Sequence, residues 1–322
     1  MATIASLSIA ARAILDMHSL NNEGGEGNQI QTRMVDIFGA DGHMHNVNAI
    51  SGDMLKHIQT QHFFELARAQ GLPLCAGCAR FDANRINADT AWVKEMPSSD
   101  PAALDGLLQR CALDDTAGIL MTAGGRSLPR KSVVEFGWVI GIPKLVESNS
   151  YFHVKYAQRD QGRRTADAAA RDTEGSNLGQ AIFHRPASSG IYAIVCHVEL
   201  GRIGYNDITQ KYAISEDERL RRARALLQSV AHTFIELNGA MRTTQLPHLV
   251  GLEGAVSWSA SAATPAPLLS PLMDDYLGET ERVAMALGGA SAVARFDSLG
   301  MFAEMMGQQA KEAVPASLIP AR

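Results

Sequence analysis

The side chains best suited to metal or redox chemistry are four cysteines, two of which are closely spaced. Cys75 and Cys78 have the Cys-x-x-Cys spacing of half a zinc site. A complete site needs a second pair, and the sequence has no second CxxC and no HxxxH pair. The pair follows a predicted helix and a Leu-Pro-Leu linker, whereas a redox CxxC opens a helix after a strand. We interpret it as a structural loop and predict no metal ligand.

Ten histidines raise the possibility of a metal-dependent hydrolase or nuclease. They are scattered, and neither an HExxH nor an HxExxC arrangement occurs. GxSxG, Walker and kinase signatures are missing as well. We predict no catalytic residue, no enzyme activity and no cofactor. A nuclease assembled from dispersed Asp and His residues stays open as a third alternative.

The segment from His18 to Asn28 is rich in asparagine and glycine, including Asn21, Asn22 and Gly27. Backbone N–H groups in such a loop can cradle phosphates, and amide side chains can bind sugars. A surface turn explains the same composition, because glycine and asparagine tolerate positive φ angles. On spacing alone the turn is favoured, since the loop contains two glutamates. We expect an irregular loop.

Ser51 occupies the N-cap position of a predicted helix, with Lys56 and His57 about one turn further on. A helix N-terminus beside cationic side chains is a ready anion site. Ordinary capping is the simpler explanation, because nearly every helix has a cap.

Basic residues concentrate in three places. A solvated helix face explains the group at 219–224, because Glu216, Asp217 and Glu218 can pair with its arginines. The group at 159–171 lies in a long polar segment, and contact with a ligand explains its arginines better than solvation does. The three groups are Arg159, Arg163, Arg164 and Arg171; Arg219, Arg221, Arg222 and Arg224; and Arg242 beside Thr243 and Thr244.

The elements that position these residues are predicted in the order strand, helix, strand, then strand, helix, strand. This order is typical of an α+β, ferredoxin-like fold. The first segment could be strand or helix by periodicity, and its position favours a strand. Turn residues at 39–42 predict a hairpin. The predicted strands cover 3–15, 32–38, 44–50, 133–140, 191–200 and 249–258, and the helices follow Ser51 and Ser215 and end before Gly71 and Asn238.

Long excursions interrupt this order. Residues 74–130 and 155–185 are expected to build little core by themselves. Residues 262–271 are a Pro/Ala/Ser-rich linker into a C-terminal helix near 273–287, and the last dozen residues are expected to fray.

Composition indicates one elaborated globular domain of 322 residues, with 46% hydrophobic and 20% charged residues. Its net charge of −5 gives no global attraction to nucleic acid, so any RNA site must be local. Four cysteines are too few for a disulfide framework, and no apolar run is long enough to span a membrane. We expect a cytoplasmic protein with no membrane partner.

The first sixty residues resemble the DevR family of CRISPR-associated proteins. Weaker support comes from the Leu-Pro-Leu-Cys run, Gly137-Trp138, the segment 239–242 and Leu246-Pro247. The matching residues, in order, are Leu7-Ser8, Arg12, Leu20-Asn21-Asn22-Glu23-Gly24, Gly27-Asn28, Arg33 and Ala49-Ile50-Ser51-Gly52-Asp53-Met54-Leu55-Lys56-His57.

The resemblance implies an RNA-recognition-motif-like palm with large finger, web and thumb insertions. Residues 1–262 would form the palm, with 74–130 finger-like and 155–185 thumb-like. Residues 263–322 would form a linker, C-terminal helix and tail.

It also implies a backbone subunit of the type I surveillance complex, Cascade. Copies would stack head to tail along the guide RNA (crRNA), beside other Cascade subunits, and leave its bases to pair with target DNA. A standalone autoregulator of transcription is the alternative. The RNA-binding residues implied or inferred are Arg12, Asn21, Asn22, Gly27, Asn28, Arg33, Ser51, Lys56, His57, Arg163, Arg164, Arg242 and Thr243.

Overall fold

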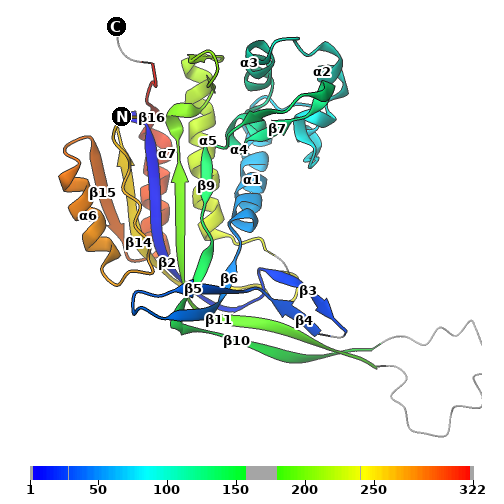
Figure 1. Cartoon of the computed structure of the whole chain (residues 1–322), viewed down its shortest axis with the longest axis vertical. Coiled ribbons are helices and arrows are strands. Elements are labelled where there is room, and N and C mark those ends of the chain that lie inside the picture. The colour runs from blue at the N-terminus through cyan, green and yellow to red at the C-terminus, as the bar shows by residue number, and fades with distance from the viewer. Residues whose placement is uncertain (1–2, 28, 157–179, 240, 320–322) are drawn as a thin grey trace, which may run out of the picture.

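The computed structural model describes residues 3–27, 29–156, 180–239 and 241–319, and its core is an antiparallel sheet around β2 (Ser6–His18) (Figure 1). β2 lies between β11 (Gln180–Val198) and β14 (His248–Ser259). β15 (Ser291–Phe296) extends the sheet beyond β14, and β9 (Val134–Phe136) pairs with the C-terminal end of β11. The strand order is therefore β15-β14-β2-β11-β9.

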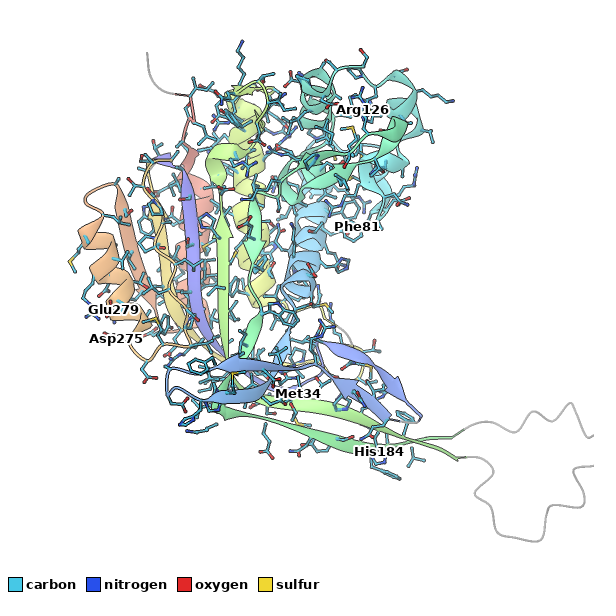
Figure 2. The ribbon with its side chains drawn as sticks, viewed as in Figure 1. Met34, Phe81, Arg126, His184, Asp275 and Glu279 are labelled. Carbon is cyan, nitrogen blue, oxygen red and sulfur yellow. The ribbon has the colours of Figure 1, made fainter. Side chains whose placement is uncertain are left out.

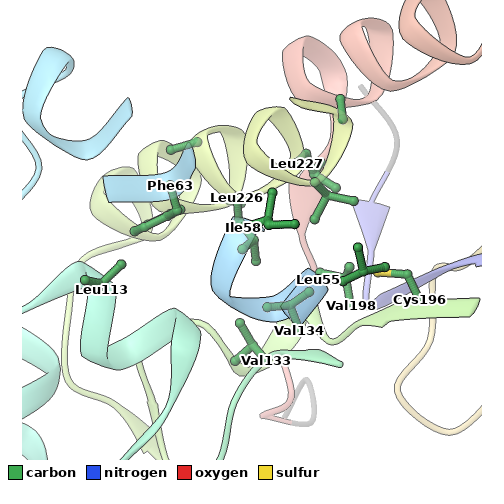
Figure 3. Close-up of a cluster of buried hydrophobic side chains, with 14 of the residues drawn as sticks. Leu55, Ile58, Phe63, Leu113, Val133, Val134, Cys196, Val198, Leu226 and Leu227 are labelled. Carbon is green, nitrogen blue, oxygen red and sulfur yellow. The ribbon is translucent and has the colours of Figure 1, made fainter. Parts of the chain in front are cut away.

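Three helices cover one face of this sheet: α1 (Gly52–Ala69), α5 (Glu216–Ile235) and α7 (Leu299–Glu312). Their apolar faces meet the buried side chains of the strands, as Leu55, Ile58 and Leu226 do beside Val134 and Val198 (Figure 3). All five are at most 2% exposed. Truncating one of them to alanine should cost about 2–5 kcal/mol, because the cavity cannot fully collapse.

A second group of strands extends from the lower end of the sheet. β10 (Val139–Tyr156) and the N-terminal part of β11 form a long two-stranded arm. β6 (Met44–Ile50) pairs with the start of β10 and with β5 (Met34–Phe38), and β3 (Asn22–Glu26) pairs with β4 (Gln29–Thr32) beside β11. These hairpins lie below the N-terminus of α1 (Figure 1).

Residues 74–130 form a folded insertion above α1. Its side chains, Trp92, Leu104, Leu107 and Leu128 among them, join the single core. The expectation that this excursion builds little core is wrong, because its apolar residues pack on one another and on α1. Its elements are η1 (Cys78–Arg80), η2 (Arg85–Ala88), α2 (Thr90–Glu95), α3 (Asp100–Arg110), α4 (Ala112–Ala117), β7 (Ile119–Met121), η3 (Ala123–Gly125) and β8 (Leu128–Arg130).

The C-terminal region is more structured than predicted. α6 (Tyr276–Ala286) is the expected helix, but β15 and α7 follow it and complete the sheet and its covered face. The last dozen residues were expected to fray, yet β16 (Val314–Pro315) pairs with β1 (Thr3–Ile4) and Ala316 is buried. The remaining short elements are η5 (Leu200–Arg202) and the pair β12 (Tyr205–Asn206) and β13 (Lys211–Tyr212).

The predicted order of strand, helix, strand, strand, helix, strand is confirmed, and so are both capped helices. Two local predictions were wrong. The Asn/Gly loop contains the β3–β4 hairpin, in which Gly24 lies at a register shift within β3 and Gly27 in the turn, both at positive φ. The run 133–140 is split at Gly137 and Trp138. The 155–185 excursion begins and ends in strand, and residues 157–179 lie outside the described structure.

The arginines of α5 are not all on a solvated face. Arg221 pairs with Glu218 as expected, but Arg219 is 4% exposed and Arg222 is 0% exposed. Arg219 lies over the Tyr212 ring, with its guanidinium carbon 3.7 Å from the ring centroid. These guanidinium groups therefore hold the core together.

Among the described helices, none is long and apolar enough to cross a membrane.

Candidate nucleic-acid interface

Residues that the sequence singled out meet where α1 begins. Ser51 Oγ accepts a hydrogen bond from the Met54 N–H at 3.2 Å, which caps the helix, and lies 3.5 Å from Asn21 Oδ1. The Asn21 carbonyl accepts from the Arg33 N–H at 3.2 Å. Asn48 donates to the Arg33 carbonyl at 3.0 Å. We call Asn21, Arg33, Asn48 and Ser51 the α1-base cluster.

Arg33 connects the α1-base cluster to an exposed aromatic ring. Its guanidinium carbon lies 5.4 Å from the centroid of the Trp138 ring, a cation–π contact. Trp138 is 44% exposed, in the break between β9 and β10. An arginine stacked on an exposed indole offers both a charge for phosphate and a flat surface for a base or sugar.

The segment after α5 packs beside this cluster. A Cβ added at Gly239 would overlap the Leu20 side chain, so the backbone approaches the Asn21 loop closely. Thr244 accepts a hydrogen bond from Arg185 of β11 at 2.9 Å. Arg242 pairs with Glu236 at 2.9 Å and contacts Asn238, while Thr243 is exposed. The predicted Arg242 and Thr243 therefore follow a segment that contacts the Asn21 loop, and Arg242 is already bound to a carboxylate.

Lys56 and His57 line a pocket of about 360 Å³ between α1 and the insertion, here called the insertion pocket. Phe81 and Arg85 form its other wall, and both hold positive φ angles, 53° and 49°. Such angles cost about 1–3 kcal/mol each and persist where packing fixes them. Phe81 lies at the edge of the insertion beside α1, above the hairpin that carries Met34 (Figure 2).

The electrostatics of the insertion pocket favour an incoming anion at one end. Partial burial lowers the pKa of Lys56, and the positive charge of Arg85 lowers it further. Lys56 and Arg85 repel each other, so a phosphate placed between them would stabilise both positive charges. Asp53 and Asp82 also line the pocket, and the negative charges of Glu135 and Asp53 act on the pKa of Lys56 in the opposite direction.

The other predicted residues are more dispersed. Asn22 starts β3 and accepts from Ser19 Oγ at 2.8 Å, and Gly27 turns the β3–β4 hairpin at φ 62°. Arg12 donates to the carbonyls of Pro271 and Met273, each at 2.9 Å, so it anchors the linker before α6. The structure thus uses Arg12 internally. Asn28, Arg163 and Arg164 lie outside the described residues.

Sequence reasoning missed several residues of this surface. The only sequence signal at Trp138 was the family resemblance. The apolar run 133–140 that contains it does not predict that its side chain is exposed. Arg185, Phe81 and Arg85 had no signal, because tertiary contacts bring them to the site. The CxxC pair was likewise incomplete: Cys111 and Asp114 lie against Cys75 and Cys78, and these four side chains could hold a metal.

Comparison with known proteins identifies the family. The sequence model of a family described as CRISPR-associated negative auto-regulator DevR/Csa2 matches residues 9–281. The chain therefore belongs to the DevR/Csa2 family of CRISPR-associated proteins, as the first sixty residues predicted.

Individual relatives are distant but match along most of their length. The chain is 25% identical over 293 residues to the CRISPR-associated protein Cas7/Cst2/DevR of Methanocaldococcus jannaschii, covering 86% of this chain and 88% of the relative. It is 23% identical over 307 residues to the CRISPR-associated aCascade subunit Cas7/Csa2 2 of Saccharolobus solfataricus, covering 89% and 88%. A solved structure titled CRISPR RNA-guided surveillance complex, pre-nicking, aligns over 94% of this chain and 99% of its own with a TM-score of 0.49 and 10% identity.

Proposed function

We propose that the chain is a backbone subunit of a type I CRISPR surveillance complex, Cascade, which polymerises along crRNA. The observation that carries this proposal is the DevR/Csa2 match over residues 9–281, which contains the α1-base cluster and the insertion pocket. The name of the Saccharolobus relative, an aCascade subunit, supports the same role.

In this proposal the central sheet is a ferredoxin-like, RNA-recognition-motif-like palm with finger, web and thumb insertions. The connection order β2-α1-β9-β11-α5-β14 and the packing of α1 and α5 on the same face of the sheet support it. The insertion at 74–130 corresponds to the fingers, and the 155–185 segment to the thumb.

The RNA would be held by its phosphates and sugars. Asn21, Ser51 and the N-terminus of α1 provide short polar donors, and Lys56 and Arg33 provide charge. Contacts of this kind fix position and carry no sequence information, so the bases stay available for pairing with target DNA.

The proposal includes no catalytic step. Copies of the chain would bind head to tail, together with other Cascade subunits, and any cleavage of the target would be done elsewhere in the complex. Head-to-tail assembly reconciles the net charge of −5 with RNA binding, because acidic edges can be buried against basic ones.

The test is to co-express the chain with its CRISPR array and neighbouring genes, purify it, and sequence the RNA that accompanies it. We expect repeat–spacer guides bound to several copies of the chain. A free dimer bound to promoter DNA would instead support an autoregulator. RNA cleavage that is lost on adding a chelator would support a nuclease. Either result would refute the backbone role.

Arg163 and Arg164 stay predictions from the sequence. Replacing both with alanine should weaken guide binding and reduce its dependence on salt by about 0.7 log–log units for each phosphate that is no longer neutralised. An unchanged salt slope would remove both residues from the proposed interface.

A further inference from the structure

Cys75, Cys78, Cys111 and Asp114 form a buried cluster at the junction of the insertion and α1. The four possible ligand atoms all lie within 4.8 Å of one another. Cys75 and Cys78 flank the turn before η1, and Cys111 and Asp114 flank the start of α4. All four side chains are at most 1% exposed. The chain thus supplies two x-x spaced pairs, CxxC and CxxD, that folding brings together.

From this geometry we infer that the four side chains bind one structural Zn²⁺ ion. Tetrahedral zinc with ligands at about 2.3 Å for sulfur and about 2.0 Å for oxygen places sulfur and oxygen ligands about 3.5 Å apart. Asp114 Oδ2 lies 3.4 Å from Cys75 Sγ and 3.5 Å from Cys78 Sγ. The pocket is therefore the right size before any ion enters it.

The aspartate provides an independent indication. Three aspartates of the insertion are 0% exposed: Asp89, Asp114 and Asp115. Asp89 pairs with Arg110, and Asp115 pairs with Arg130 and Arg222. Among the described residues, Asp114 has no arginine or lysine within ion-pair distance, and its Oδ1 has no hydrogen-bond partner. A buried carboxylate without a cation is costly, and a metal ion removes that cost.

The surroundings are arranged as in a metal-binding turn. The Cys78 N–H donates to Cys75 Sγ at 3.3 Å, and the Asp114 N–H donates to Cys111 Sγ at 3.4 Å. Such donors favour thiolate ligands. Gly77 allows the tight turn, because an added Cβ would overlap the carbonyl of Arg85.

A second layer of contacts fixes the first cysteine turn. Asp89 accepts from the Ala76 N–H at 3.0 Å and is itself held by Arg110 at 2.8 Å. Zinc binding would release the thiol protons to solvent and leave three thiolates and one carboxylate around the ion. The ion would join two segments of the insertion, around η1 and at the start of α4, and so hold them together. This inference does not depend on the proposed role in RNA binding.

The test is metal analysis of the full-length protein, purified without added chelator. We expect about one zinc per chain in the wild type, and loss of most of it in Cys111→Ser and Asp114→Ala. Cys196→Ser is the matched control, because Cys196 is an equally buried thiol in β11 outside the cluster. It should retain the full zinc content. Zinc that survives Cys111→Ser, or iron in place of zinc, would overturn the assignment.

A second measurement avoids variants that fail to fold. Co²⁺ added to folded, metal-free wild-type protein should give the strong visible bands of tetrahedral cobalt and the near-ultraviolet thiolate charge-transfer band. Zn²⁺ should displace it. A folded wild-type protein that contains no zinc and takes up no Co²⁺ would mean that the cluster is held only by S–H···O hydrogen bonds.

Discussion

Lys56 reaches the insertion pocket from the second turn of α1, with Arg85 on the other wall. Partial burial lowers its pKa, so the ammonium is less well solvated here than on an open surface. A phosphate that enters the pocket would restore the missing stabilisation. We therefore propose that Lys56 contacts a phosphate of the guide RNA.

Lys56→Gln should weaken guide-RNA binding and lower the log–log salt slope by about 0.7, the value for one phosphate contact on a single strand. Lys311→Gln is the control, since Lys311 is an exposed lysine of α7 outside the pocket. Filter binding from low to moderate salt measures both. Equal slopes for the two variants would exclude Lys56 from the interface.

His18 affects stability rather than binding. It is 2% exposed, and burial lowers its pKa from 6.5 to about 4. Its Nδ1 accepts from the Leu20 N–H at 3.5 Å, beside the α1-base cluster. The neutral imidazole is thus the form that the fold accommodates.

This gives a pH dependence with a definite sign. Between pH 6.5 and 4 the unfolded chain binds a proton at His18 more readily than the folded chain, so stability falls as pH falls. The loss approaches about 3 kcal/mol at the lower end. In urea unfolding, His18→Gln should flatten this part of the profile. His43→Gln, an exposed control, should leave it unchanged.

At the scale of elements, α1 links the two halves of the candidate interface. Its N-terminus faces the α1-base cluster, and Lys56 and His57 face the insertion pocket. Ser51 fixes where the helix starts. Ser215 caps α5 with the same 3.2 Å hydrogen bond, far along the chain from the cluster.

This pair of caps separates stability from binding. Ser51→Ala and Ser215→Ala should each lower the free energy of unfolding by about 1 kcal/mol, because each leaves one helix N–H without its cap. Only Ser51→Ala should also weaken guide binding. If the two variants bind RNA equally well, the start of α1 is a structural feature alone.

The elements predicted correctly carry their own local signals. N-cap serines and helical spacing mark α1 and α5, and the Gly39 to Gly42 turn marks the β5–β6 hairpin. β15 and α7 were missed, because the Pro/Ala/Ser-rich linker before them suggested a tail. The β3–β4 hairpin was missed because its composition is that of a turn.

The candidate site was predicted only where its residues carry a pattern in the sequence. Asn21, Arg33 and Ser51 carried a family pattern and meet in the structure. Trp138, Arg185 and the partners of the CxxC pair reach their places through long-range packing. The CxxC pattern gave no indication of Asp114, because zinc sites are recognised in a sequence by cysteine and histidine.

At the scale of the whole molecule, a buried ion network joins the insertion to the core. Asp115 of α4 accepts from Arg130 at 2.7 Å and from Arg222 of α5 at 2.9 Å, with all three side chains 0% exposed. The Gly204 N–H also donates to it. Arg130 also pairs with Asp207 at 3.2 Å and Arg222 with Glu218 at 2.9 Å, so Asp115 is the carboxylate that the two buried guanidinium groups share.

Asp115→Asn should lower the free energy of unfolding by about 3–5 kcal/mol, because it leaves those guanidinium groups without their shared carboxylate. Asp217→Asn, at an exposed position in α5, should change it by no more than about 0.5 kcal/mol. Chemical denaturation of the full chain measures both. Similar midpoints would show that Asp207, Glu218 and the backbone carbonyls around Arg130 and Arg222 suffice.

β11 belongs to both the core sheet and the arm, so the arm has no separate joint at its base. Its register shifts between Ser188 and Gly190, where Gly190 has φ 147° and no room for a Cβ against the Leu145 carbonyl. The angle of the arm is therefore set by irregularities in two continuous strands, at Gly190 of β11 and between Gly141 and Val146 of β10, and changing it means breaking ladder hydrogen bonds. In a stack of identical copies, that bend would be repeated at every step. A bulkier residue at position 190 would then change the bend in every copy. The change would be small in one subunit, but it would add up along the stack and alter the pitch of the whole filament.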